Sequence, residues 1–386
     1  MPSCRRRDRC LEPDQTPRRS LTRTAAVARI GRTEVVSRSA VEAPEPGGGW
    51  RCPRGSSMTD LFWNRRQARL RAGWRVALFV VASSVASIAL AGPGRRALRR
   101  LLPVVYANVV EVVVLVLLIG VFLWMAARWL DRRPIVDYGF HLSGAWWLDL
   151  GFGLVLGVFL MAGVYALALA IGWVKVTGTL LSPPGQPFIA AILADVILVV
   201  GIACWEEIVF RGYVIKNLAE GLYSKTVGAR WATVIAILIP SVLFGLAHVT
   251  NANATMLSTV NTVIFGVVFG AAYALTGELA LPIGLHIAWD FVQGFGLGRS
   301  GDVPGLGAFL VVEEGDSAAR LWTGWPFTVE GGLLGTAALV AGLLLIAAWV
   351  RLRRGSVRLD PSLVQPPIQI PATPRSTGSS ARSVTA

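Results

Sequence analysis

Eight long runs with few charged side chains divide the chain between residues 76 and 350. A helix needs about 20 predominantly apolar residues to cross the hydrocarbon core of a membrane, and the runs are close to this length. Trp and Tyr side chains gather near their ends, as they do at membrane–water interfaces. We predict an all-α, polytopic membrane protein with about eight transmembrane helices, at residues 76–91, 104–127, 150–173, 188–210, 231–249, 257–276, 281–297 and 333–350.

The composition supports this class and argues against a soluble enzyme of two domains. Of the 386 residues, 54% are hydrophobic and only 16% are charged, and the mean hydropathy is +0.57. The formal net charge is +14, but the basic residues lie in the first 100 residues and in loops. They are not interleaved with the aromatic side chains of a nucleic-acid groove. The expected partner is therefore membrane lipid, and nucleic acid is not expected.

The basic residues also predict the orientation of the chain. Arginines precede the first predicted span at residues 65–75 and follow the last at 351–354, which by the positive-inside rule places both termini in the cytoplasm. Four arginines within residues 95–100 fall on the opposite side and disagree with this orientation. Lys occurs only three times. We attribute the preference for Arg to a GC-rich genome and predict a protein of the bacterial plasma membrane.

The two ends of the chain differ from the part between them. Residues 1–57 are rich in Arg, Pro and Gly and lack apolar periodicity, so we expect this extension to be disordered. Met58 is a plausible true start, and an Arg-rich targeting peptide is the alternative. Residues 355–386 are rich in Ser, Thr and Pro, and we predict a second disordered tail there. Residues 58–354 then form the membrane domain.

Glu206 and Glu207 lie side by side in the fourth predicted span, which Arg211 closes. An ionisable group at membrane depth is costly and indicates a functional site. Because residues four apart share one face of a helix, we expect Glu207 to pair with Arg211 and to be structural. Glu206 then points about 100° away and is free to react. The alternative is that both carboxylates only form a buried ion network with Arg211.

Two of the three histidines, His248 and His286, also lie in apolar segments. Each belongs to a pair with a spacing of four residues, with Phe244 before His248 and Asp290 after His286. Either histidine alone is more often a core residue than a catalytic one. Together with Glu206, they supply what hydrolysis needs: a base for water, a positioning imidazole and a donor to an oxyanion.

Glu206, His248 and His286 are also the residue types of a three-ligand zinc site with an open fourth position. Their spacing would place the metal between helices. Asp290 lies one turn after His286 and can fix the tautomer of its imidazole. One divalent metal, zinc, is therefore one prediction, and a metal-independent glutamate mechanism is the other.

Two further function classes stay open. Asp195 lies about three helical turns before Glu206, and Glu111 also lies in a predicted span. A ladder of acids is typical of a proton-coupled transporter, although the chain shows no convincing inverted repeat. We expect Asp195 to make a polar contact between helices. A non-catalytic membrane scaffold or immunity protein is the third class.

Three motifs on successive predicted spans resemble those of one protein family. They are Glu206-Glu207-x-x-x-Arg211, Phe244-x-x-x-His248 and His286-x-x-x-Asp290. Within residues 185–295, these motifs are similar to those of the CPBP family, which comprises type II CAAX prenyl endopeptidases and Abi-type intramembrane proteases.

The resemblance implies an eight-span helical core with its catalytic groups on spans four to seven. It implies an intramembrane endopeptidase, described as a metalloprotease, that cleaves a membrane-associated protein or peptide. In this family pattern Glu206 activates water with His248, while His286 and the residue at 290 support the oxyanion. The prenyl-protease branch has Asn where this chain has Asp290. A carboxylate donates a hydrogen bond only when protonated, so this difference argues against prenyl-CAAX substrates.

Simple alternation of the spans raises one difficulty for such a site. It places Glu206 near the inner end of span four and His248 at the outer end of span five, more than about 15 Å apart at 1.5 Å per residue. The site closes only if span four continues past Arg211, or if span five enters the membrane late, near Pro240.

Overall fold

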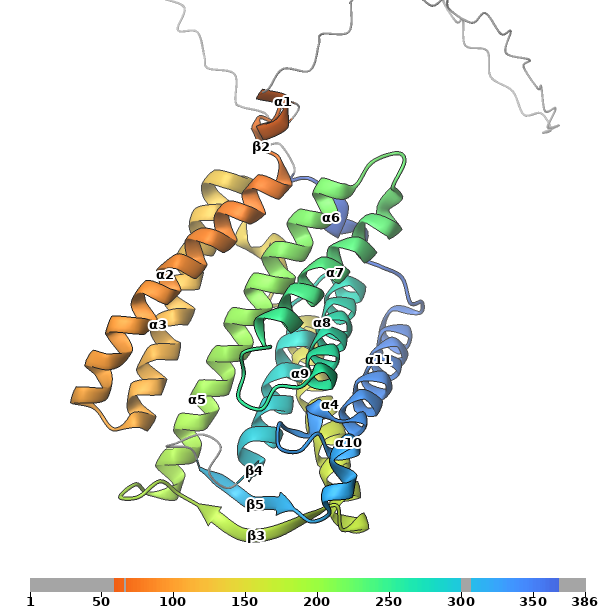
Figure 1. Ribbon diagram of the computed structural model, residues 1–386. Coiled ribbons are helices and arrows are strands. Elements are labelled where there is room, and N and C mark those ends of the chain that lie inside the picture. Colours follow the sequence, from red (N-terminus) through yellow and green to blue (C-terminus); the bar gives the residue numbers. More distant parts are fainter. Residues whose placement is uncertain (1–58, 66, 300–306, 368–386) are drawn as a thin grey trace, which may run out of the picture. The chain divides into compact units, whose positions relative to one another are not determined.

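The computed structural model describes residues 59–65, 67–299 and 307–367, which form a bundle of long helices with a small sheet at one end (Figure 1). Seven of the described helices are long and apolar enough to cross a membrane, so the prediction of an all-α polytopic membrane protein is confirmed. They are α2 (Ala72–Leu101), α3 (Val104–Met125), α4 (Gly144–Ile171), α5 (Phe188–Glu206) with its continuation, α7 (Gly228–Ala247), α8 (Met256–Thr276) and α11 (Leu333–Arg354).

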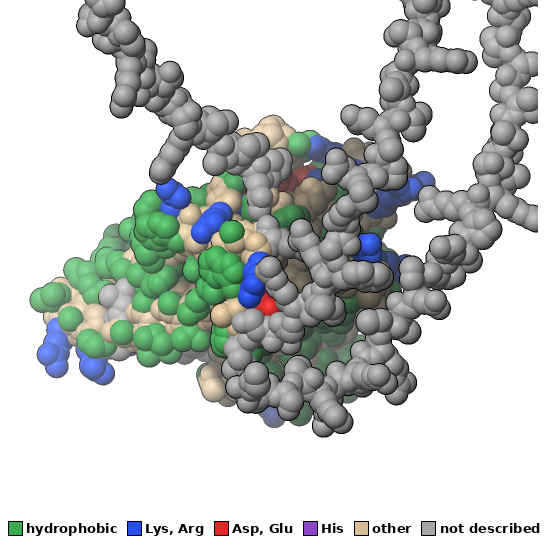
Figure 2. Space-filling model, turned by 90° about the horizontal axis from the view of Figure 1, so that it is seen from above, with side chains coloured by type: hydrophobic (Ala, Val, Ile, Leu, Met, Phe, Trp, Pro, Cys, Tyr) green, Lys and Arg blue, Asp and Glu red, His purple; other side chains and the backbone are tan. Residues whose placement is uncertain are grey.

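The flank of the bundle is apolar. Side chains such as Val85, Phe159 and Ile189 are more than 60% exposed although they are hydrophobic. Figure 2, which views the molecule from above, shows hydrophobic side chains over much of the surface that is drawn in colour, with scattered Lys and Arg side chains. Apolar patches of this extent mark a surface that another apolar phase covers, and on membrane-length helices that phase is lipid.

The seventh predicted span, at residues 281–297, is not a long helix. It consists of α9 (Ala280–Phe291) and a π-helical turn, η4 (Val292–Gly296). Most of α9 is buried, including Leu281, Leu285 and Trp289. Because protein surrounds this helix, it does not need the length that contact with lipid would require.

The fourth span is longer than predicted. After α5 the helix continues as a π-helix, η3 (Glu207–Ile215), and then as α6 (Lys216–Leu222). At 1.5 Å per residue, Glu206 lies about 24 Å along the fourth span from the turn that joins this span to α7. His248 lies about 30 Å along α7 from the same turn. The two residues therefore lie at similar depths. Span four continues past Arg211, which was one of the two conditions for a closed site, whereas α7 already begins at Gly228.

A three-stranded sheet lies at the end of the bundle opposite α1 (Figure 1). Its central strand β5 (Ala308–Glu314) pairs antiparallel with β3 (Val174–Leu181) and parallel with β4 (Leu297–Arg299). The segments between the sheet and α11 include η5 (Ser317–Ala319), α10 (Arg320–Thr323) and η6 (Val329–Gly331). This sheet was not predicted from the sequence, because its strands lie between the apolar runs.

At the other end, the N-terminal elements and the C-terminal segment pack on the bundle. The N-terminal elements are α1 (Thr59–Phe62), β1 (Trp63–Asn64) and β2 (Arg69–Leu70), and the turns η1 (Ala126–Asp131) and η2 (Ile135–Tyr138) follow α3. Near the C-terminus, η7 (Pro361–Val364) buries Leu363 and Val364, and Lys216 Nζ donates to Ser362 O at 2.5 Å. The predicted disorder of 355–386 is therefore wrong for residues 355–367, because these apolar side chains find a site on the bundle. The predicted disordered segment at 1–57 lies outside the described residues.

Candidate active site

The fourth span changes its helical form between the two adjacent carboxylates. Glu206 is the last residue of α5, and Glu207 is the first of the π-helix η3. A π-helical turn is wider than an α-helical turn, and such turns occur often at functional sites. Both side chains are buried, with Glu207 completely enclosed.

Glu207 joins its own helix η3 to α9 through one oxygen atom. Its Oε1 accepts a hydrogen bond from Arg211 Nη1 at 2.8 Å and another from His286 Nδ1 at 2.8 Å. The predicted Glu207–Arg211 pair is therefore confirmed. Since a carboxylate only accepts hydrogen bonds when ionised, Nδ1 of His286 carries a proton. Glu207 thus orients this imidazole, a role that we had assigned to Asp290.

The opposite edge of the His286 ring faces two further carboxylates. Its Nε2 lies 3.5 Å from Asp290 Oδ2 and 3.8 Å from Glu206 Oε2. The structure therefore brings together Glu206, Glu207, His286 and Asp290, from α5, η3 and α9. Separations above 3.5 Å are compatible with one bridging water, so Glu206 and His286 can share a reacting water molecule.

Arg211 is held behind Glu207 by aromatic rings. Its guanidinium lies over Phe244 at 4.8 Å and over Phe269 at 5.5 Å. Such cation–π contacts stabilise a cation that has lost its water. Phe244 thus has a structural role, because it covers the ion pair that orients His286.

His248 reaches the site less directly. Its Nδ1 lies 2.8 Å from the carbonyl oxygen of Phe244, and its half-buried ring packs on the Phe244 ring with centroids 4.5 Å apart. Among the described residues, it forms no hydrogen bond or ion pair with Glu206 or His286. Phe244 also stacks on Phe265, whose ring meets His286 edge-on. Aromatic contacts therefore connect His248 to the site.

The predicted zinc ligands do not assemble into a metal site. The described part of the chain holds no group of three His, Cys, Asp or Glu side chains arranged to bind a metal ion. Glu206 and His286 face each other, but His248 is directed to the Phe244 carbonyl. The side chains thus do not fit a three-ligand zinc site, and zinc stays a prediction for solution experiments.

A comparison with protein families matches the segment that contains these side chains. Residues 187–292 match the family model of the Rce1-like type II CAAX prenyl endopeptidases. The chain carries an Rce1-like domain. This confirms the resemblance to the CPBP family, and the matched residues include every candidate site residue named so far. No curated protein and no solved structure matches the chain.

Close packing places α9 of the Rce1-like domain against α4. A Cβ atom at Gly284 would meet Leu150 O at 2.3 Å, and one at Gly153 would meet Leu281 O at 2.5 Å. Gly266 and Gly270 make similarly close approaches to Ser241 and Ile237. Gly266, Gly270 and Gly284 therefore lie at positions where helices pack closely. On α9 this packing fixes the depth of His286.

Gly284→Ala should displace α9 and thereby impair both folding and any reaction at His286. The added methyl group meets backbone atoms of α4, which cannot rotate away, and overpacking of this kind costs about 1–3 kcal/mol. Unfolding in detergent micelles measures the loss of stability. Gly163→Ala is the matched control, since open space surrounds Gly163 on α4. Equal behaviour of the two variants would contradict the packing role.

Sequence reasoning did not find Glu330, which lies in η6 outside the Rce1-like match. Its Oε2 accepts a hydrogen bond from Trp289 Nε1 at 3.3 Å, and Trp289 immediately precedes Asp290. The signal in the sequence was weak, because Glu330 lies in the loop before the last predicted span at residues 333–350. Its position three residues before α11 was the only hint that it approaches the bundle.

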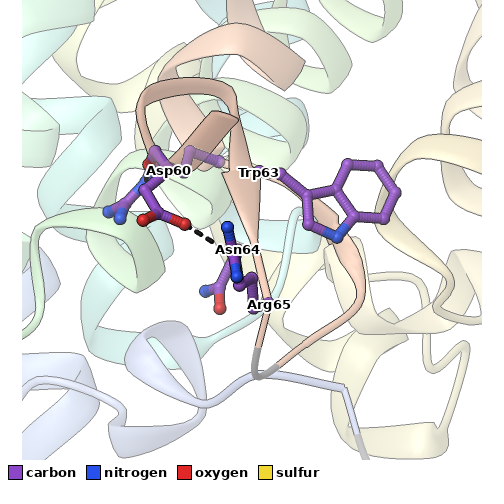
Figure 3. Close-up of a pocket in the computed structure, with 5 residues that line it drawn as sticks. Asp60, Trp63, Asn64 and Arg65 are labelled. Carbon is purple, nitrogen blue, oxygen red and sulfur yellow. Dashed lines mark hydrogen bonds and ion pairs between the residues drawn. The ribbon is translucent and has the colours of Figure 1, made fainter. Parts of the chain in front are cut away.

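A surface pocket near the N-terminal elements lies apart from these residues. It is lined by Asp60, Trp63, Asn64, Arg65 and Arg71, and Figure 3 shows Asp60 and Arg65, whose ion pair measures 2.7 Å. These residues belong to α1, β1 and the segments beside them, not to the Rce1-like domain. The pocket therefore has no part in the candidate active site.

Proposed function

We propose that the protein is an intramembrane endopeptidase that hydrolyses a peptide bond with water activated by Glu206. One observation carries the proposal: Glu206 and Asp290 face Nε2 of His286, while the Glu207–Arg211 pair holds Nδ1. The match of this segment to a protease family supports it.

In this mechanism Glu206 accepts a proton as water attacks the carbonyl carbon of the substrate. With Glu207 at one nitrogen and Asp290 near the other, His286 can carry protons on both nitrogens and donate from Nε2 to the developing oxyanion. Glu206 then returns its proton to the leaving amine nitrogen, and the peptide bond breaks. Asp290 orients His286, because an ionised carboxylate cannot donate to the oxyanion. His248, at a similar depth, completes the polar lining.

The substrate class follows from the apolar flank and from Asp290. We propose a membrane-associated protein or peptide without a prenyl group, cleaved in a bacterial plasma membrane. Both termini lie on the cytoplasmic side in this proposal. Two acids that favoured a transporter have local partners instead. Asp195 accepts from the amide of Gly307 at 2.9 Å, so its contact is with a loop and not with a helix, and Glu111 pairs with Arg95.

The test uses the purified full chain in detergent with two internally quenched peptides, one transmembrane and unprenylated, the other farnesylated with a CAAX end. We expect cleavage of the first peptide. Glu206→Ala should lower the rate by about 100-fold or more, the usual contribution of a general base. His248→Ala removes a side chain of the polar lining and should lower the rate less. Glu313→Ala, an exposed carboxylate on β5, is the control. Without cleavage of either peptide, the non-catalytic scaffold becomes the better account.

The same assay decides the metal prediction. Because the described side chains do not form a three-ligand set, we expect cleavage to persist after treatment with EDTA. Loss of cleavage that added zinc restores would favour the metal mechanism instead.

A further inference from the structure

Glu330 connects α9 to a part of the chain outside the Rce1-like domain. Trp289 is completely buried, and a buried indole N–H needs an acceptor. Glu330 Oε2 is that acceptor, at 3.3 Å. Trp289 immediately precedes Asp290 in the sequence, so Glu330 binds the turn that carries Asp290.

The backbone of Glu330 is itself fixed from two sides. Asn261 on α8 donates from Nδ2 to the carbonyl oxygen of Glu330 at 2.6 Å and to that of Gly332 at 2.9 Å. Thr336 on α11 donates to Asn261 Oδ1 at 2.7 Å. Asn261 is buried, and its amide thus ties η6 to both helices. A side chain on such a support can hold its partners in one geometry.

The charge of Glu330 acts on the same site. Burial raises the pKa of Glu330, and the charge of Asp290 raises it further, whereas the hydrogen bond from Trp289 lowers it. The Glu330 carboxylate therefore interacts with Asp290 on α9.

We infer that Glu330 is a positioning residue for the reaction: by accepting a hydrogen bond from Trp289, it holds the end of α9 so that Asp290 stays at Nε2 of His286. The inference rests on the proposed function for its consequence in catalysis. It names a residue of the segment before α11, which the match at residues 187–292 does not include. It predicts that the acceptor oxygen of residue 330 matters more than its charge.

Hydrogen exchange tests the positioning without any assay of cleavage. In the full chain in detergent, Glu330→Ala should speed amide exchange in residues 286–294 by about tenfold or more, since the turn opens more easily without its anchor. Glu330→Gln should leave exchange near that of the wild type, because its amide oxygen accepts the same hydrogen bond from Trp289. Glu313→Ala, which removes an exposed carboxylate, should change nothing.

Kinetics with the unprenylated quenched peptide test the consequence. Glu330→Ala should lower kcat by about tenfold to 100-fold, as loss of an orienting partner does, with KM nearly unchanged. Glu330→Gln should restore most of kcat. A global loss of folding would lower the active fraction in both variants alike, so this rescue separates positioning from stability.

Other results of the exchange and kinetic experiments would contradict the inference or a part of it. Unchanged exchange in Glu330→Ala shows that Glu330 does not hold α9, whether or not the wild type cleaves the peptide. Faster exchange with unchanged kcat shows that the anchor has no bearing on the reaction. Equal damage by Gln and Ala contradicts the hydrogen-bonding role. If the wild type cleaves neither peptide, the proposed function fails, while exchange still decides whether Glu330 anchors α9.

Discussion

Glu207→Gln should destabilise the protein by about 3–5 kcal/mol and also suppress cleavage, whereas Glu206→Gln should suppress cleavage alone. Glu207 is completely enclosed and shares one oxygen between Arg211 and His286. Replacing it by a neutral amide leaves the buried guanidinium without its counter-charge. Glu206 forms no ion pair with an arginine among the described residues, and its contact with His286 is long, at 3.8 Å.

The two variants should also differ in how they affect the reaction. Loss of the general base in Glu206→Gln should lower the rate by about 100-fold to 10,000-fold. Glu207→Gln should lower it by about 10-fold to 100-fold, because His286 loses the partner that fixes its orientation. Unfolding monitored by tryptophan fluorescence and peptide cleavage give the two readouts on the same preparations. A stable, active Glu207→Gln protein would show that the division of roles between the carboxylates is wrong.

The sequence predicted the site where the relevant contacts are local. Glu207 and Arg211 are four residues apart on one helix, so their pairing follows from helical periodicity. The contact between Glu207 and His286 is different, because it depends on how α9 is rotated against the fourth span. Periodicity does not specify this rotation; the close packing at Gly284 does. The roles of Glu207 and Asp290 at His286 were therefore not predictable from spacing.

The length of the fourth span could not be read from hydropathy. Lys216, Asn217 and Glu220 look like loop residues in the sequence, yet all three are buried in α6. Their polar groups have partners that are distant in the chain, such as Asp131, which accepts from Asn217 at 2.9 Å. Local apolarity predicts helices that face lipid, but a helix end enclosed by protein can be polar when its groups are paired.

Glu220→Ala should destabilise the protein by about 3–5 kcal/mol, because one carboxylate serves three buried arginines. Glu220 pairs with Arg69, with Arg133 and, at 3.1 Å, with Arg75. Burial and the charge of Arg75 lower the pKa of Arg69 to about 10, even with Glu220 beside it. The arginines join β2, α2 and the segment after η1 to α6, so removal of their shared counter-ion should loosen all of these elements.

The companion variants distinguish a charge effect from a packing effect. Asp131 would be the remaining acid for the three guanidinium groups, through its bond to Arg75 at 2.5 Å. Combining Glu220→Ala with Arg133→Ala should therefore recover part of the lost stability, since one uncompensated charge leaves with its partner. Glu314→Gln, at an exposed pair with Arg320, should leave unfolding unchanged. If the double variant is less stable than Glu220→Ala by the full effect of Arg133→Ala, the two side chains act independently and the network is not held together by charge.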